Sequence, residues 1–501
     1  ELPTGSGKTL VGLLIGEYRR RKNNEKVLFL CPTNQLVHQV VEQANEKYGL
    51  KAVAFCGKQK EYTQKDKFNF LSNEVIGVTT YSSFFAANSF FQDVSILIMD
   101  DVHSAEDYIV SNWTIQIERG ATIFLEIAEL LKPVISDTDY MCLMEEEDEN
   151  LKPMSSCNMV PMPLFMDKIQ ELNIILNNGI EPGSKNRFAY ERIAENLQEC
   201  NIYIENGKIL IRPWIAPTMT VDNFSKVKQR ILMSATLGKS GELERVTGIK
   251  RIKRLPVVND WDKKGLGRKF FVFPDNFQEK LDTNEVIAGL QELCKKSVFL
   301  VPDSHSEREI EELYEEYMED TQVFHAKDIE ESKQEFLAAP DATAILANRL
   351  DGMDFADDES RLLFIRNLPV TTNLQEKFLS SRMGASVLYR ERIKTRIIQA
   401  VGRCSRNPSD YSIVCVMGNA INKELVDCNN NKKFPPELRA ELEFGAMNSA
   451  DYTSVDDLLE QAEDFWNRTD DWKVAEENII EMRNDFCKQD DNDEKQVNEK
   501  L

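Results

Sequence analysis

A glycine-rich segment at the start of the chain, Pro3-Thr4-Gly5-Ser6-Gly7-Lys8-Thr9, restricts the possible folds more than any other feature of the sequence. Glycines allow backbone N–H groups to close around phosphate oxygens, while a lysine adds a point charge and a threonine hydroxyl can hold Mg²⁺. A loop of this kind connects a β-strand to a helix. The segment therefore predicts a nucleotide site, and we expect the chain to be a fragment because the strand that would precede the loop is missing.

Short apolar runs follow the loop and alternate with helical stretches, the first of which covers residues 9–22. Such runs are typical of buried parallel strands in α/β domains. The runs lie at 27–30, 52–55, 75–78, 96–99 and 230–233. A second series begins at residue 270 and continues to about 418, with runs at 298–301, 322–324, 344–346, 362–365 and 413–416. Together they predict an α/β fold with two parallel-sheet domains in tandem.

The segments outside these two series differ from them in composition. The stretch from 104 to 228 is mostly helical, with helices expected at 121–132, 163–177 and 185–200, an acidic solvated loop at 145–149, and a hairpin over 202–211 that turns at Asn206-Gly207. The predicted boundaries are 1–106 plus 225–245 for the first domain, 107–224 for a mainly helical insertion, 246–269 for a basic linker, 270–430 for the second domain and 431–501 for an acidic helical tail.

The chain is acidic overall, with 61 basic and 84 acidic residues and a net charge of −23. This balance excludes a uniformly basic surface for nucleic acid or acidic membranes, although a local basic groove is compatible with it. The sequence has no run of 18 apolar residues and no secretion leader, so we expect no membrane partner. The ten cysteines lack the short spacings of zinc or iron–sulfur sites, which is typical of a reduced, cytoplasmic protein.

Polar residues follow the apolar run at 96–99 directly, as Asp100-Asp101-Val102-His103. At the carboxyl end of a strand beside the phosphate loop, Asp100 would face Mg²⁺ held near Thr9, and Asp101 would orient or deprotonate an attacking water. The alternative is a strand that simply ends in polar turn residues. His103 taken alone would be a surface histidine.

Two arginines three residues apart, Arg403 and Arg406, follow Gln399 late in the second series. On a helix they would share a face, and each guanidinium could bind phosphate through two hydrogen bonds. Arginines in this arrangement can neutralise the charge that develops during phosphoryl transfer. The alternative is an ordinary cationic helix surface.

The order of these segments resembles that of superfamily 2 helicases of the DEAD/DEAH-box type. The matching segments are 3–9, 31–39, 79–83, 100–103, 234–236, 301–304, 351–355 and 399–406. Residues 352–355, Arg361, Leu368-Pro369 and the large insertion are most similar to the XPD/DinG-like branch. The resemblance covers about 1–110 and 225–420, and it implies two RecA-like domains with ATP between them and a nucleic-acid strand across both.

The resemblance also implies roles for individual residues. ATP would be bound by Thr4, Gly5, Ser6, Gly7, Lys8 and Thr9, together with Gly352 and Asp354, and Mg²⁺ by Thr9 and Asp100. The catalytic residues would be Asp101, Gln399, Arg403 and Arg406. The strand would be contacted by Thr33, Thr79 and Thr80, while His103, Ser234 and Thr236 would couple hydrolysis to movement.

Two features depart from the resemblance. The branch usually has four cysteines for an iron–sulfur cluster between the phosphate loop and the acidic motif, whereas that interval holds only Cys31 and Cys56, so we expect no cluster. Asp101 stands where glutamate is usual. Its side chain is shorter by one C–C bond, about 1.5 Å, and a misplacement on the order of 1 Å can lower a rate about 100-fold.

The sequence therefore predicts an ATP-dependent helicase or translocase that acts on single-stranded or partly duplex nucleic acid, with DNA favoured by the branch resemblance. One alternative is an ATP-gated clamp or remodeller of the same fold that never separates strands. Another is a nonenzymatic scaffold that binds a protein partner through its insertion or tail. A small-molecule kinase with a phosphate loop would explain neither the paired arginines nor the Ser-Ala-Thr segment.

Overall fold

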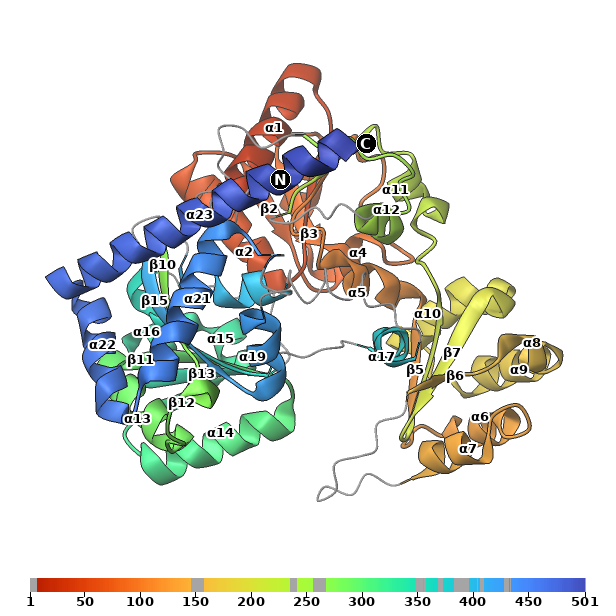
Figure 1. Cartoon of the computed structure of the whole chain (residues 1–501). Coiled ribbons are helices and arrows are strands. Elements are labelled where there is room, and N and C mark those ends of the chain that lie inside the picture. Colours follow the sequence, from red (N-terminus) through yellow and green to blue (C-terminus); the bar gives the residue numbers. More distant parts are fainter. Residues whose placement is uncertain are drawn as a thin grey trace. The chain divides into compact units, whose positions relative to one another are not determined.

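The structure is a computed structural model in which two compact units can be distinguished (Figure 1). It describes residues 7–145, 157–234, 241–255, 267–347, 355, 357–367, 373–382, 396–402, 404–405, 410–427, 432 and 434–500, with the side chains of 242, 330–331, 357, 380 and 491–500 left aside. The first unit comprises Gly7–Leu255 and Val370–Glu391, and the second comprises Pro256–Pro369 and Arg392–Leu501.

A five-stranded parallel sheet in the order β2-β3-β1-β4-β9 forms the centre of the first unit. Its strands are β1 (Val27–Cys31), β2 (Ala52–Phe55), β3 (Ile76–Thr80), β4 (Ile96–Met99) and β9 (Gln229–Leu232). Each corresponds to an apolar run of the sequence. The prediction of a parallel α/β domain in this part of the chain is confirmed.

Side chains of the central strands alternate between two apolar cores. Val27 and Phe29 of β1 face a core that includes Leu13, whereas Leu28 and Leu30 face the larger core on the other side of the sheet. This is the period-two pattern of a strand that is buried on both faces. Full burial of each such side chain contributes about 1.5–3 kcal/mol, which explains why a run of consecutive apolar residues forms a strand here.

Helices precede, connect and follow the strands of this sheet. They are α1 (Lys8–Asn23), α2 (Asn34–Glu42), α3 (Gln64–Leu71), α4 (Tyr81–Phe84), α5 (Ala105–Val110), α11 (Asp222–Ser225) and α12 (Glu242–Thr247). The hydroxyls of Thr33, Thr63 and Thr80 accept hydrogen bonds from backbone N–H groups at the starts of α2, α3 and α4. Caps of this kind contribute about 1 kcal/mol each, so these threonines help to fix where the three helices begin.

The insertion between α5 and α11 contains its own antiparallel sheet, in the order β5-β8-β7-β6. Its strands are β5 (Ile115–Glu118), β6 (Asn158–Met159), β7 (Cys200–Glu205) and β8 (Lys208–Pro213), and its helices are α6 (Phe124–Leu131), α7 (Asp137–Met144), α8 (Met162–Phe165), α9 (Ile169–Gly179) and α10 (Lys185–Ile193). The predicted hairpin is β7–β8, with Gly207 at a φ of 61°. β5 and β6 were not predicted, and residues 146–149 of the acidic run lie outside the described residues.

The second unit contains a six-stranded parallel sheet in the order β10-β15-β14-β11-β13-β12. Its strands are β10 (Arg268–Val272), β11 (Lys296–Val301), β12 (Gln322–His325), β13 (Ala342–Ala347), β14 (Leu362–Arg366) and β15 (Tyr411–Met417). Alternate residues again face two cores, with Phe299 on one side and Val298 on the other. The predicted second parallel-sheet domain is confirmed, although β10 was not among the predicted strands.

The predicted helical tail is part of the packing of this second unit. The helices here are α13 (Thr283–Cys294), α14 (Ser304–Tyr317), α15 (Ala326–Glu331), α16 (Lys333–Ala338), α19 (Asn419–Val426), α21 (Pro436–Asp451), α22 (Val455–Asn467) and α23 (Asp470–Lys500). A Cβ at Gly445 of α21 would lie 2.4 Å from the Phe271 carbonyl oxygen, so glycine permits close approach to β10. Within the described part of the chain, no helix combines the length and apolar character needed to cross a membrane.

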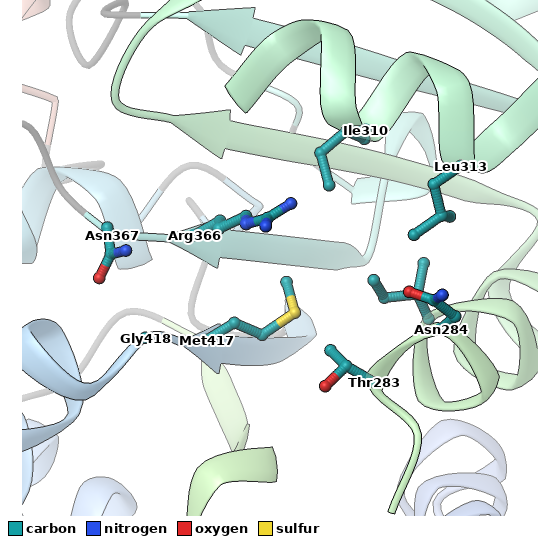
Figure 2. A pocket seen from close by; sticks show the side chains of 9 residues that line it. Thr283, Asn284, Ile310, Leu313, Arg366, Asn367, Met417 and Gly418 are labelled. Atoms are coloured by element: carbon teal, nitrogen blue, oxygen red, sulfur yellow. The ribbon is translucent and has the colours of Figure 1, made fainter. Parts of the chain in front are cut away.

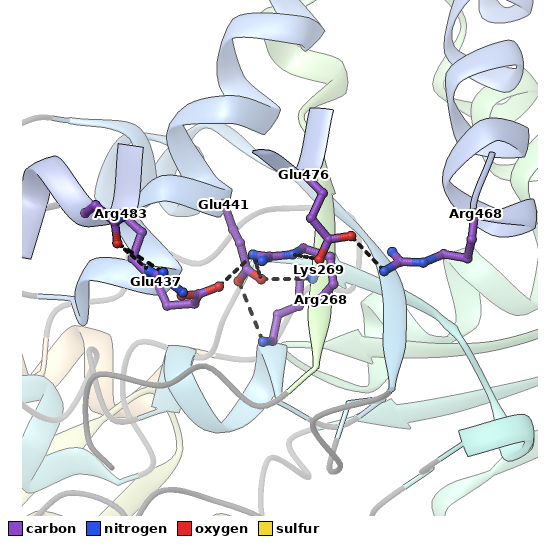
Figure 3. Close-up of polar contacts among 8 residues, drawn as sticks. Arg268, Lys269, Glu437, Glu441, Arg468, Glu476 and Arg483 are labelled. Carbon is purple, nitrogen blue, oxygen red and sulfur yellow. Dashed lines mark hydrogen bonds and ion pairs between the residues drawn. The ribbon is translucent and has the colours of Figure 1, made fainter. Parts of the chain in front are cut away.

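A buried ionic network joins β10 to the tail helices (Figure 3). Arg268 Nη1 lies 2.7 Å from Glu437 Oε1 and 3.2 Å from Glu441 Oε1, and Arg268 Nε lies 3.3 Å from Glu476 Oε1. The Lys269 N–H also donates to Glu441 Oε1 at 3.0 Å. Arg268 and Lys269, which the sequence places in the linker 246–269, therefore belong to β10. Their charges look solvated in the sequence but are neutralised by acidic residues of the tail.

A helix from the second half of the sequence belongs to the first unit. α17 (Leu374–Ser381) packs against β7, where Gln375 Nε2 donates to the Tyr203 hydroxyl at 3.1 Å and the rings of Tyr203 and Phe378 are 5.7 Å apart. Just before it, Asn373 Nδ2 donates to Asp107 Oδ1 at 2.9 Å. The predicted domain 270–430 is thus interrupted at α17, which side-chain contacts assign to the insertion.

Candidate functional site

Lys8 is the first residue of α1 and follows Gly7, whose φ of 79° lies in the left-handed region that favours glycine. The first turn of α1 contains no acidic side chain, so its N–H groups and the positive end of the helix dipole stay available for an anion. A Cβ at Gly12 would lie 2.8 Å from the Met233 sulfur. Glycine therefore lets α1 lie close to the end of β9, which fixes the position of Lys8.

Two carboxylates at the end of β4 meet the first turn of α1. Lys8 Nζ lies 3.3 Å from Asp101 Oδ1, a contact between residues 93 positions apart. The Asp100 carboxylate accepts the Asp101 N–H at 3.1 Å, and the neighbouring Thr9 hydroxyl lowers the pKa of Asp100. The structure thus brings together Lys8, Thr9, Asp100 and Asp101, as the sequence predicts.

The electrostatics of Asp100 follow from this crowding. Burial at the end of the sheet raises the pKa of Asp100 to about 7, and the neighbouring charge of Asp101 acts in the same direction. Lys8, the Asp101 N–H and the Thr9 hydroxyl lower it again without compensating fully. The carboxylate is therefore held where further positive charge would stabilise its ionised form.

Asp101 has an unusual backbone conformation, with a φ of 45°. A left-handed residue other than glycine costs about 1–2 kcal/mol. The local contacts that hold the turn are the Ser104 N–H and hydroxyl, which both donate to the Asp101 carbonyl at 2.9 Å, and the Tyr81 hydroxyl, which donates to the Asp100 carbonyl at 2.7 Å. Sequence reasoning missed Tyr81 and Ser104, since neither hydroxyl belongs to the acidic motif.

The residues present fit a magnesium ion. Mg²⁺ prefers oxygen ligands and is commonly bound by one or two protein groups together with phosphate and water, and the neighbouring oxygens of Thr9 and Asp100 offer such a pair. When bound there, the ion would neutralise charge on a triphosphate. Among the described residues, no group of three or more His, Cys, Asp or Glu side chains could hold a metal without such a substrate.

The acidic turn is tied to the end of β9. His103 Nδ1 lies 2.5 Å from the hydroxyl of Ser234, which is 1% exposed, and the Val102 N–H donates to the Met233 carbonyl at 3.1 Å. A displacement of the turn would therefore move the chain that follows β9. Sequence analysis assigns His103 and Ser234 to coupling without predicting that they touch, and the structure shows this contact. Thr236, the third residue assigned to coupling, lies outside the described residues.

Two family models match the sequence. The DEAD/DEAH box helicase model matches residues 1–123, and the Helicase C-terminal domain model matches residues 271–439. The chain belongs to the superfamily 2 helicases of the DEAD/DEAH-box type. The resemblance drawn from the order of the motifs is confirmed.

Solved structures show that this helicase has an XPD-like fold. A structure of apo XPD has a TM-score of 0.51 at 16% identity, covering 84% of this chain and 92% of that one. A second structure, of XPD helicase, has a TM-score of 0.51 at 15% identity, covering 85% and 94%. No curated protein sequence matches the helicase.

The threonines predicted to contact nucleic acid have different environments in the helicase. Thr33 and Thr80 lie at the starts of α2 and α4 and cap them, with Thr33 partly exposed. Thr79 is 0% exposed and its hydroxyl donates to the Phe55 carbonyl at 2.8 Å. The prediction that Thr79 contacts a strand is contradicted, because a buried hydroxyl bonded to the chain's own backbone cannot reach a phosphate.

The remaining predicted residues are in part outside the described ranges. Those outside are Thr4, Gly5, Ser6, Gly352, Asp354, Arg403 and Arg406. Gln399 lies in a helical stretch at 396–401. Ile397 and Ala400 of this stretch pack into the core of the second unit that includes Val298. The absence of an iron–sulfur cluster stays a prediction from the sequence, with Cys31 buried in β1 and Cys56 just after β2.

Proposed function

We propose that this helicase hydrolyses ATP at the site around Lys8 and uses the reaction to move along a nucleic-acid strand. The observation that carries the proposal is the meeting of Lys8, Thr9, Asp100 and Asp101, with 3.3 Å between Lys8 Nζ and Asp101 Oδ1. A lysine at a helix N-terminus supplies positive charge for a triphosphate, and adjacent carboxylates supply a metal ligand and a group for the attacking water.

In the proposed reaction, Lys8 exchanges one anionic partner for another. Its Nζ contacts Asp101 in the structure and would turn to the β- and γ-phosphate oxygens when ATP binds. The Asp101 carboxylate, on a side chain that is 34% exposed, would then accept a hydrogen bond from water and orient it towards the γ-phosphate. Arg403 and Arg406 supply further positive charge to the reacting phosphate, and Gln399, Gly352 and Asp354 complete the set of nucleotide contacts.

The strand would be bound through its backbone rather than its bases. Thr33 lies partly exposed at the N-terminus of α2, where its hydroxyl can donate to phosphate. Thr80 would have to exchange its hydrogen bond to the Ser83 hydroxyl for one to phosphate. Such contacts position a strand without reading its sequence, as a translocating protein requires. We propose DNA as the strand because of the XPD/DinG-like motifs, with coupling through His103, Ser234 and Thr236.

The test is ATP turnover by the chain without nucleic acid, with single-stranded DNA and with single-stranded RNA of equal length. We expect stimulation by DNA that exceeds stimulation by RNA. Greater stimulation by RNA would overturn the choice of strand, and turnover that neither strand changes would overturn the coupling.

The aspartate at position 101 favours a second candidate function, that of an ATP-gated clamp that never separates strands. Its carboxylate is one methylene shorter than glutamate and sits on a left-handed residue, so hydrolysis could be slow and serve to release the strand. A displacement assay on duplexes with 3′ and 5′ overhangs, run beside the turnover assay, separates the two. Stimulated turnover without displacement from either overhang supports the clamp, and displacement supports the helicase.

A further inference from the structure

A small cavity opens in the second unit where two neighbouring strands end (Figure 2). β14 and β15 pair in parallel with Arg366 opposite Met417, and both of these residues line the cavity. Its volume is about 290 Å³. This lies at the lower end of the roughly 300–1,000 Å³ of pockets for drug-sized ligands, so it can take one ring system but not a nucleoside triphosphate.

Two residues with positive φ follow these strands and line the cavity. Asn367 has a φ of 50° and Gly418 a φ of 114°. A Cβ at Gly418 would lie 2.1 Å from the Asn367 Oδ1, so only glycine allows the Asn367 amide to rest there. Open parallel sheets commonly bind ligands outside the carboxyl ends of their strands, and the contact between Asn367 and Gly418 fixes the Asn367 amide at such an end.

The walls of the cavity suit a flat apolar surface. Figure 2 shows Ile310 and Leu313 of α14 pointing towards Met417 and Asn284 from the opposite side. Aliphatic side chains and a thioether make favourable contacts with the face of an aromatic ring. The planar guanidinium of Arg366 adds a surface on which a ring can stack.

The polar groups of the cavity favour a neutral ligand over an anion. The charge of Arg366 is balanced by Glu309, with 2.9 Å between Nη2 and Oε2, and the Gly418 N–H is occupied by Asp275 at 2.8 Å. The amides of Asn284 and Asn367 line the same space, and each offers both donors and an acceptor. Among the described residues that line the cavity, the cation is Arg366, whose charge is already compensated, so a phosphate gains little there. A heterocycle with donors and acceptors on its edge would find matching groups.

From these features we infer that the cavity binds a single nucleobase, stacked between α14 and the ends of β14 and β15 and read by the amides of Asn284 and Asn367. The base comes either from the strand or from a free nucleoside. The first source rests on the proposed function, whereas the second does not depend on it. Bases of a translocating strand would then be held in turn at this position of the second unit.

Whether the base comes from a nucleic-acid strand is tested by fluorescence anisotropy. The two probes are a 20-nucleotide single-stranded DNA and the same sugar–phosphate backbone without bases. Leu313→Trp fills the cavity, and Tyr317→Trp, at an exposed position of the same helix, is the matched control. We expect Leu313→Trp to weaken binding of the intact strand about tenfold, in line with the loss of one stacked base, and to leave the abasic strand unchanged. Tyr317→Trp should bind both strands like the unmodified chain.

The free nucleoside is tested by NMR of the Met417 methyl group, assigned with Met417→Leu, during titration with deoxyadenosine and deoxycytidine. A shift that Leu313→Trp abolishes supports the cavity even if the chain binds no strand and turns over no ATP, so failure of the proposed function remains distinguishable. If Leu313→Trp does not fold, Asn284→Ala removes one amide without filling the space and should reduce the same responses. Equal binding of the intact strand by both tryptophan variants, together with an unmoved Met417 signal, overturns the inference.

Discussion

The proposed chemistry depends on single side chains, and the role of Asp101 can be tested most directly. Asp101→Asn removes the negative charge but keeps the size of the side chain and tolerates a positive φ. We expect ATP turnover to fall on the order of 100-fold or more, since a positioned general base contributes at least that much, while ATP affinity is retained. The measurements are steady-state phosphate release and nucleotide binding.

Asp93→Asn is the control for Asp101→Asn, because Asp93 is exposed and also has a positive φ of 56°. The variant at 93 should turn over ATP like the unmodified chain. Equal turnover in both variants would remove Asp101 from the proposed mechanism.

At the residue scale, the motifs predicted Lys8, Thr9, Asp100 and Asp101 correctly as neighbours because their chemistry depends on residue type and local position. The interpretation of Thr79 does not fit the structure, because local motif position does not show whether a side chain is buried. Its hydroxyl was interpreted from a motif, whereas β3 is buried along its whole length and the hydroxyl is consumed by Phe55. Tyr81 and Ser104 were missed because their role is to hold the turn rather than to meet a substrate.

Among the elements, β10 shows how a charged segment can be structural. Arg268→Met would leave Glu437 and Glu441 buried without their main partner. Breaking a buried pair in this way destabilises a protein by about 3–5 kcal/mol. We therefore expect the free energy of unfolding of the second unit, measured by urea denaturation, to fall by about that amount. Lys488→Met, which removes an exposed ion pair with Asp485, should change it by less than about 0.5 kcal/mol. Equal effects would mean that the network is not structural.

The contact between β12 and α14 predicts a pH dependence. Burial lowers the pKa of His325, but its hydrogen bond to Glu307 and the charge of Glu311 outweigh burial and raise it above the usual value. The pair therefore stabilises the fold below the unfolded pKa of about 6.5, and this stabilisation is lost as pH rises through the raised value. NMR titration of the four histidines should place His325 above 6.5, and Glu307→Gln should lower its pKa. An unchanged pKa in Glu307→Gln would contradict this.

The docking of α17 on the insertion is also testable. Phe378 packs on Tyr203, and Phe378→Ala should increase hydrogen exchange about tenfold or more in the amides of 374–381 by weakening local closure. Ser381→Ala, at an exposed position of the same helix, should leave exchange unchanged. Equal exchange in both variants would mean that α17 is held by other contacts.

At the element scale, each predicted strand of the two parallel sheets is present, because short apolar runs have few alternatives to burial between two helix layers. The errors share a cause, which is pairing over long distances in the sequence. β10 begins with Arg268, whose partners lie 169 and 173 positions later, and α17 is bound by residues of the insertion 161 to 172 positions earlier. A local sequence pattern cannot predict contacts between residues so far apart in the chain.

At the scale of the whole molecule, two parallel-sheet units must both contribute to hydrolysis if the motor proposal holds. Arg406→Ala should lower ATP turnover about 1,000-fold or more, as removal of an arginine that neutralises the transition state does, with little change in ATP affinity. Arg382→Ala, at an exposed position after α17, is the control and should have no effect. Normal turnover in Arg406→Ala would confine the chemistry to the first unit.

The central claim is that Lys8 belongs to an ATP-hydrolysing site driven by a nucleic-acid strand. Its most direct test is phosphate release from ATP over increasing single-stranded DNA, compared among the unmodified chain, Lys8→Ala and Lys22→Ala, the last altering an exposed lysine of the same helix. We predict release that rises with DNA in the unmodified chain and in Lys22→Ala and stays at background in Lys8→Ala. Release by Lys8→Ala that matches the unmodified chain would contradict the account.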